Sequence, residues 1–197
     1  MKKLLLVAVC APIFLFGSEW LAKTQTTSEK SSPQQSQPRS KVIAINTNEL
    51  EALPHDAGSV KFLATSDDTN GGYAVIETTE MPGFKTSWHR HNNCEETFYV
   101  LEGVLTIKIV DKTYEMPVGS YVSLPRGTPH GQGNFSSKPV RFLTTFTPGG
   151  FEQFFKDRIE LFRSVKPGEP DFQTKYDEVR KRHRKWFEVL GTWDAKK

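Results

Sequence analysis

The sequence predicts an all-β domain, closed as a barrel or jelly roll, that is followed by an α-helical extension. Between residues 42 and 147, short apolar runs are broken at close intervals by Gly, Pro, Asn and Asp, which is the pattern of short antiparallel strands. Closure is favoured because a closed sheet hides its strand edges. After Pro148-Gly149-Gly150 the apolar residues change to helical spacing. The length of 197 residues suits one globular domain with appendages.

Turn signals divide the β region into short strands. Asn70-Gly71-Gly72, Pro82-Gly83, Glu102-Gly103 and Val118-Gly119 are typical turn sequences, and each separates two apolar runs. The expected strands are Val42–Ile45, Val60–Ala64, Tyr73–Thr78, Thr86–His91, Thr97–Leu101, Val104–Ile109, Lys112–Met116, Tyr121–Leu124, His130–Asn134 and Val140–Phe146.

Two helices are expected in the extension, residues 149–197. The break at Pro167-Gly168-Glu169-Pro170 separates them, and Asp171 is placed as the N-cap of the second. The polar face of the second helix is basic. We interpret it as a solvated face of a helix that packs on the barrel or on a second subunit, with contact to an anionic membrane as the alternative. The apolar positions are Phe151, Phe155, Ile159, Phe162 and Val165 in the first helix and Phe172, Tyr176, Val179, Trp186 and Leu190 in the second.

The N-terminal segment has the pattern of a secretory signal. Lys2 and Lys3 precede an apolar run over residues 4–17, which is shorter than the roughly 20 residues that cross a bilayer. We expect a signal peptide or N-terminal anchor over residues 1–22, and an exported protein, periplasmic or extracellular; an uncleaved membrane anchor is the alternative. Residues 23–41 contain no apolar side chain and predict a disordered linker. The barrel then occupies residues 42–148.

Charge and cysteine content exclude two classes of protein. The formal net charge is only +3, and no basic stripe follows the β region, so nucleic-acid binding is not expected. Cys10 lies in the expected signal peptide, which leaves Cys94 alone in the mature chain. A single cysteine excludes an intramolecular disulfide, so core packing must hold the exported domain together.

Three histidines and one carboxylate in the β region predict a metal centre. His89 and His91 are two residues apart, so on one strand both imidazoles share a face. On the next strand, alternation turns Glu96 inward and Glu95 outward. His130 follows a turn that is rich in Pro and Gly. Imidazole and carboxylate ligands without thiolate suit one divalent transition metal, and the sequence leaves Mn, Fe, Co, Ni, Cu and Zn open.

Alternation also suggests which side chains surround that metal. Phe98 and Val100 share the parity of Glu96, and with Phe142 they are our candidates for an apolar pocket wall. Gln132 shares the parity of His130 and is placed in the same pocket. The two other histidines, His55 and His183, are interpreted as ordinary surface or core residues.

The two histidine-containing segments resemble the two signature motifs of the cupin superfamily. That resemblance implies a cupin double-stranded β-helix, a jelly-roll barrel, with His89, His91, Glu96 and His130 as ligands. The stretch from Thr147 to Glu152 is loosely similar to bacterial single-domain cupins grouped with quercetin 2,3-dioxygenases. The first motif is matched by Gly83, His89, His91, Glu96 and Gly103, and the second by Gly119, Pro125, Gly127, His130 and Asn134.

The function expected from these features is a metal-dependent oxygenase of a small organic substrate that is phenolic, enolic or acidic. Glu96 is assigned a catalytic role as ligand and general base. Two alternatives remain open: a non-catalytic exported cupin that binds a small molecule or the metal itself, and a metal-dependent isomerase or decarboxylase. A metal that only stabilises the barrel is a further reading. The aromatic extension also suits a homodimer.

Overall fold

The computed structural model describes residues 40–194. The expected signal peptide or anchor, residues 1–22, and the linker up to residue 39 lie outside the described residues. The last two linker residues are held against the loop after β2: Ser40 Oγ donates a hydrogen bond to the Thr69 carbonyl at 3.1 Å, and Lys41 Nζ pairs with Asp68 at 2.8 Å. Within residues 40–194, neither helix is both long and apolar enough to span a bilayer.

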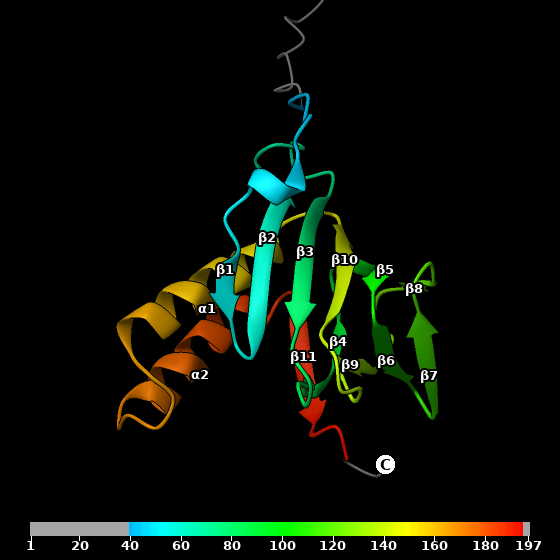
Figure 1. Cartoon of the computed structure of the whole chain (residues 1–197). Coiled ribbons are helices and arrows are strands. Elements are labelled where there is room, and N and C mark those ends of the chain that lie inside the picture. Colours follow the sequence, from blue (N-terminus) through cyan, green and yellow to red (C-terminus); the bar gives the residue numbers. More distant parts are fainter. Residues whose placement is uncertain (1–39, 195–197) are drawn as a thin grey trace, which may run out of the picture. The chain divides into compact units, whose positions relative to one another are not determined.

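The strands of the described part form two sheets (Figure 1). The six-stranded sheet has the order β1-β2-β3-β10-β5-β8, and the five-stranded sheet has the order β11-β4-β9-β6-β7. The first contains β1 (Leu53–His55), β2 (Gly58–Ala64), β3 (Ala74–Glu80), β5 (Glu95–Glu102), β8 (Tyr121–Leu124) and β10 (Val140–Thr147). The second contains β4 (Trp88–His91), β6 (Val104–Ile109), β7 (Lys112–Pro117), β9 (His130–Gly133) and β11 (Phe187–Gly191).

Strands that are distant in the sequence lie next to each other in both sheets. β10 pairs antiparallel with β3 and with β5, and β4 pairs with β9. This alternation of the chain between two facing sheets is the double-stranded β-helix, so the expected jelly-roll barrel is confirmed. Because the sheets face each other, inward side chains of both can meet inside one enclosure.

Two apolar clusters fill the domain. Along β10, every second residue from Val140 to Phe146 is buried, so one face of the sheet supplies both clusters. One cluster joins that face to the helical extension and includes Val60, Ile76, Phe146, Phe151, Phe154, Ile159 and Leu161. The other lies between β5, β8 and β10 on one side and β6 on the other, and consists of Phe98, Val100, Leu105, Ile107, Leu124, Val140 and Phe142.

The extension contains two helices, α1 (Glu152–Ser164) and α2 (Phe172–His183). α1 lies beside β1 at the edge of the six-stranded sheet (Figure 1), and it contacts α2, β1 and β3. Asp171 occupies the N-cap position of α2 as expected, although its side chain makes no capping hydrogen bond. The α-helical extension is therefore confirmed, and its apolar side chains close one side of the barrel.

The expected strand at Val42–Ile45 is wrong. This segment is extended but pairs with no strand, and it leads into a short 3-10 helix, Thr47–Glu49. Val42 is 97% exposed and Ile45 is 47% exposed, so their apolar character does not reflect burial in a sheet. The edge strand is β1 instead, which the sequence did not reveal because Pro54 lies at its centre.

The second helix is shorter than expected. It ends at His183, and the chain continues as β11, which pairs antiparallel with β4. Trp186 and Leu190 therefore do not lie on the helix. The free edge of β4 offers hydrogen-bond partners that a longer helix would leave unused, and as a strand β11 places Phe187 and Val189 on one face.

Candidate metal centre

Four side chains from three strands converge inside the barrel. His89 and His91 lie on β4, His130 lies on β9, and Glu96 lies on β5 of the opposite sheet. One ligand atom from each residue lies within 4.8 Å of the others. His89 and His130 are direct register partners on adjacent strands, which explains why residues so far apart in the sequence meet. Glu95 is exposed and Glu96 is 4% exposed, as strand alternation predicts.

The backbone orients two of the imidazoles. Nδ1 of His89 lies 2.8 Å from the Ser87 carbonyl oxygen, and Nδ1 of His130 lies 2.9 Å from the Thr128 carbonyl oxygen. A carbonyl only accepts, so in both rings Nδ1 carries a proton, and Nε2 is the nitrogen left for the cluster. Such outer hydrogen bonds fix the ring and its tautomer in metal-binding histidines.

The distances between donor atoms fit a bound cation. Nε2 of His130 lies 2.8 Å from Oε2 of Glu96, and Nε2 of His91 lies 3.1 Å from the same oxygen without hydrogen-bond geometry. Two donors that are each about 2.1 Å from an ion and at right angles to each other are about 3 Å apart. Both ring nitrogens of His91 are buried without a hydrogen-bond partner. A cation at this point would satisfy the lone pairs that the protein leaves unpaired.

The surroundings shift the pKa of His89 and of Glu96 toward the forms that bind a metal. Burial lowers the pKa of His89 well below its usual value, and the neighbouring His130 and His91 lower it further. Burial by itself raises the pKa of Glu96, but the interactions with His91 and His130 outweigh it and hold that pKa well below its usual value. A neutral imidazole and an ionised carboxylate are the forms that bind a metal.

The cluster borders a cavity of about 270 Å³. His89, His91 and Glu96 reach its wall, and the helical extension supplies much of the remaining surface. Six phenylalanines make it largely aromatic: Phe84, Phe142, Phe151, Phe154, Phe155 and Phe187. The Phe151 ring lies against His91 with centroids 4.6 Å apart. An enclosed aromatic cavity beside a polar cluster has the character of a small-molecule site.

The expected pocket residues divide into two groups. Gln132 and Phe142 line the cavity. Phe98 and Val100 are each 1% exposed, and they lie in the cluster that packs against β6 instead of among the lining residues. Strand alternation correctly predicted that both side chains point inward. It does not predict how far along the barrel the cavity extends.

The cavity also contains polar residues that the sequence did not reveal. His55 from β1, Glu80 from β3 and Arg158 from α1 line the wall beyond the metal cluster. They lie in no motif, and His55 was interpreted as an ordinary histidine. His183, read the same way, has its Nε2 3.0 Å from Asp157, between the two helices. Strand pairing in the six-stranded sheet and the packing of α1 on the barrel together bring the first three residues to one wall.

Comparison with known proteins assigns the β domain to a family. Residues 77–146, which include all four clustered residues, match the family described as "Cupin domain". Quercetin 2,3-dioxygenase of Bacillus subtilis is 27% identical over 96 residues, which are 49% of this chain and 28% of that enzyme. The HTH-type transcriptional regulator PuuR of Escherichia coli is 28% identical over 109 residues, 55% of this chain and 58% of the regulator.

These relatives are matched only in part. The chain spans less than two thirds of the length of both curated proteins. The crystal structure of ectoine synthase from P. lautus is similar with a TM-score of 0.51 and 20% identity, over 59% of this chain and 85% of that one. At this identity the likeness concerns the fold, which hosts unrelated activities. The chain therefore has a cupin fold with a cluster that could hold a metal.

Proposed function

We propose that this chain, whose residues 77–146 are a cupin domain, is a metal-dependent oxygenase of a small organic molecule with a phenol, enol or acid oxygen. The observation that carries the proposal is the convergence of His89, His91, Glu96 and His130 beside an aromatic cavity, whose wall the first three of them reach. The partial similarity to a quercetin 2,3-dioxygenase supports it. A structural metal needs no such cavity, because structural sites are usually closed by protein ligands.

The four residues would hold one divalent first-row transition metal. Such an ion supplies Lewis acidity and, when it is redox-active, a place where oxygen and substrate meet. The Ser87 and Thr128 carbonyls keep the rings of His89 and His130 aimed at the common centre. Glu96 is the one carboxylate of the set and it lines the cavity, so it is the group assigned to accept a proton from an acidic substrate hydroxyl.

The aromatic lining supports oxygenase chemistry in a second way. Phe146 and Phe151 pack edge to face with centroids 5.0 Å apart, and both rings lie against His91. This packing excludes water from one side of the cluster. A dry site strengthens the electrostatic interactions within it and protects reactive species from hydrolysis. An apolar substrate ring would pack on the same surface.

The experiment compares aerobic and anaerobic turnover. The full chain is loaded separately with Mn, Fe, Co, Ni, Cu and Zn, and oxygen uptake is measured with a panel of phenols, enols and acids. We expect oxygen-dependent product formation with at least one redox-active metal and none with Zn. Product formation at the same rate without oxygen would reject the oxygenase.

Neighbouring carboxylates provide a matched control. Glu96→Gln should lower metal content and abolish turnover, because a neutral amide replaces the charged ligand. Glu95→Gln makes the same replacement at the adjacent, exposed side chain, and it should leave metal content and turnover unchanged. Equal metal content in the wild type and Glu96→Gln would contradict the assigned ligand set.

A second candidate function is ligand binding without catalysis. Its support is the partial similarity to a transcriptional regulator, which is 28% identical over 109 residues. A binder predicts thermal stabilisation by small molecules with no product under any metal or oxygen condition. Stabilisation accompanied by turnover would reject this candidate.

A further inference from the structure

The cavity has a second polar end that the metal centre does not use. In residues 40–194, five buried side-chain nitrogen or oxygen atoms have no hydrogen-bond partner, and all belong to residues that line this one cavity. Two are the ring nitrogens of His91 at the metal centre. The other three are Nδ1 of His55, Oε2 of Glu80 and Nε of Arg158. An unpaired buried polar atom costs about 1–3 kcal/mol, so three on one wall indicate a missing partner.

Sheet register explains why two of these residues share a wall. His55 on β1 is the register partner of Gly58 on β2, and Gly58 is the register partner of Glu80 on β3. The three residues therefore form one row across the sheet. The middle residue is a glycine because a Cβ there would lie 1.9 Å from the Thr79 carbonyl oxygen, so β2 and β3 can approach each other closely at this point of the row. His55 is 4% exposed and Glu80 is 2% exposed, so solvent does not satisfy them.

Arg158 reaches this row from α1. Its Nη2 pairs with Asp56, the residue after His55, and its guanidinium lies 5.5–5.7 Å from the ring centroids of Phe154, Phe162 and Tyr176. The side chain is 14% exposed. These contacts hold the guanidinium in place and leave its Nε–H without an acceptor. A guanidinium held in this way is suited to donate a hydrogen bond to a carboxylate oxygen.

We propose that His55, Glu80 and Arg158 form the subsite for a carboxylate group of the ligand whose other end approaches the metal centre. The proposal rests on the proposed function for the metal end and names the class of substrate: a small aromatic acid with an oxygen donor opposite its carboxylate. Six phenylalanines line the same cavity and offer the surface on which the aromatic body packs.

Protonation makes the subsite a set of donors. Burial, and then the charge of Glu96, raise the pKa of Glu80 well above its usual value, so its carboxyl group keeps a proton to donate. Burial and the charge of Arg158 lower the pKa of His55 to about 3, so its ring is neutral and has one N–H.

The experiment measures binding to the full chain loaded with Zn²⁺, which is redox-silent. Calorimetry compares benzoate, 4-hydroxybenzoate and 4-hydroxycinnamate with their carboxamides, which keep the shape and remove the charge. We expect at least one acid to bind at least tenfold more tightly than its amide. If no acid binds more tightly than its amide, the subsite is overturned.

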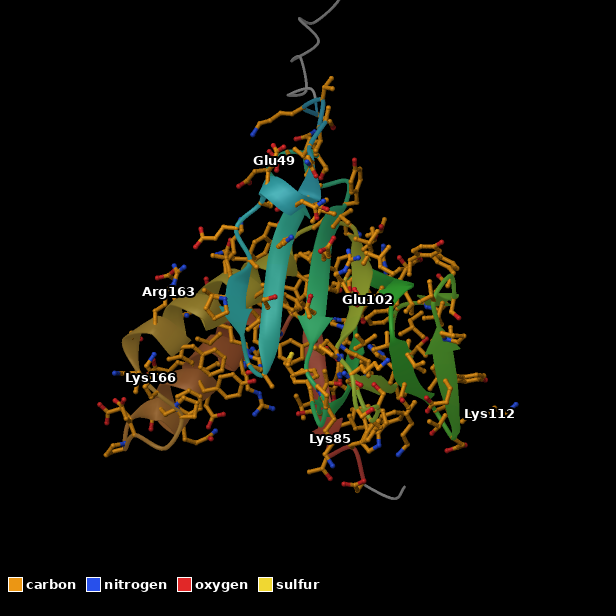
Figure 2. The ribbon with its side chains drawn as sticks, viewed as in Figure 1. Glu49, Lys85, Glu102, Lys112, Arg163 and Lys166 are labelled. Atoms are coloured by element: carbon orange, nitrogen blue, oxygen red, sulfur yellow. The ribbon has the colours of Figure 1, made fainter. Side chains whose placement is uncertain are left out.

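Three variants test which residues cause the preference for the acid over its amide. Arg158→Gln should weaken acid binding at least tenfold and leave amide binding unchanged. His55→Phe keeps a ring between Phe84 and Phe155, removes the nitrogen, and should weaken acid binding at least threefold even if Arg158→Gln does not fold. Arg163→Gln is the control, because Arg163 projects outward from α1 (Figure 2) and is half exposed. Equal weakening of acid and amide would overturn the assignment.

The two proposals fail separately. A carboxylate preference that depends on Arg158, with no oxygen-dependent turnover under any metal, would reject the oxygenase and support the subsite. Oxygen-dependent turnover of acids and amides bound with equal affinity would support the oxygenase and reject the subsite.

Discussion

The buried carboxylate of Glu152 is expected to fix the helical extension to the barrel. Its Oε1 accepts hydrogen bonds from Ser66 N at 2.8 Å and from Ser66 Oγ, and its Oε2 accepts from Gly150 N at 2.6 Å. Glu152 is 1% exposed. In Glu152→Gln, the amide oxygen can serve only one side, and its NH₂ group then faces a backbone or hydroxyl donor. One charge-assisted bond is worth about 1.5–3 kcal/mol, and the others weaken with the lost charge.

We therefore expect Glu152→Gln to lower the free energy of unfolding by about 2–4 kcal/mol, and the melting temperature by roughly 5–15 °C. Urea denaturation at constant pH, followed by tryptophan fluorescence, measures the change. Glu160→Gln on the same helix is the control, since Glu160 is 68% exposed and its pair with Arg163 is worth at most about 0.5 kcal/mol. A loss below about 1 kcal/mol for Glu152→Gln would refute the reasoning.

The remaining predictions concern one glycine, one thiol and one histidine. Gly150→Ala should destabilise the fold by at least about 2 kcal/mol in urea denaturation, because φ is +130° and a Cβ would lie 2.4 Å from the Trp186 ring; wild-type stability would contradict this. The Cys94 thiol should react with Ellman's reagent only on unfolding, because burial and the charge of Glu96 raise its pKa to about 12; rapid native labelling would exclude it. The pKa of His55 falls from 6.5 to about 3 on folding, so between these pH values only the unfolded chain binds a proton at His55. Lowering the pH through this range therefore destabilises the fold. From pH 7 to 5, the wild type should lose about 2 kcal/mol relative to His55→Gln; parallel pH curves would count against it.

Much of the fold could be predicted because strands carry a local signature. The predicted ranges Val104–Ile109 and Tyr121–Leu124 coincide with β6 and β8, and the change to helical spacing correctly located α1. Errors arose where local pattern and tertiary pairing disagree. Val42–Ile45 looks like a strand but finds no partner, and Phe187–Gly191 continues a helical spacing but pairs with the edge of β4.

The sequence by itself predicted which side chains of the ligand-bearing strands point inward, because alternation along a strand depends only on neighbouring residues. It also identified the three histidines and Glu96 as a set of candidate metal ligands. The tertiary structure alone decided how deep the cavity runs and which distant groups share it. His55, Glu80 and Arg158 follow no common period; sheet register and the docking of α1 place them together. Contacts of that kind depend on packing between elements, and no local spacing records them.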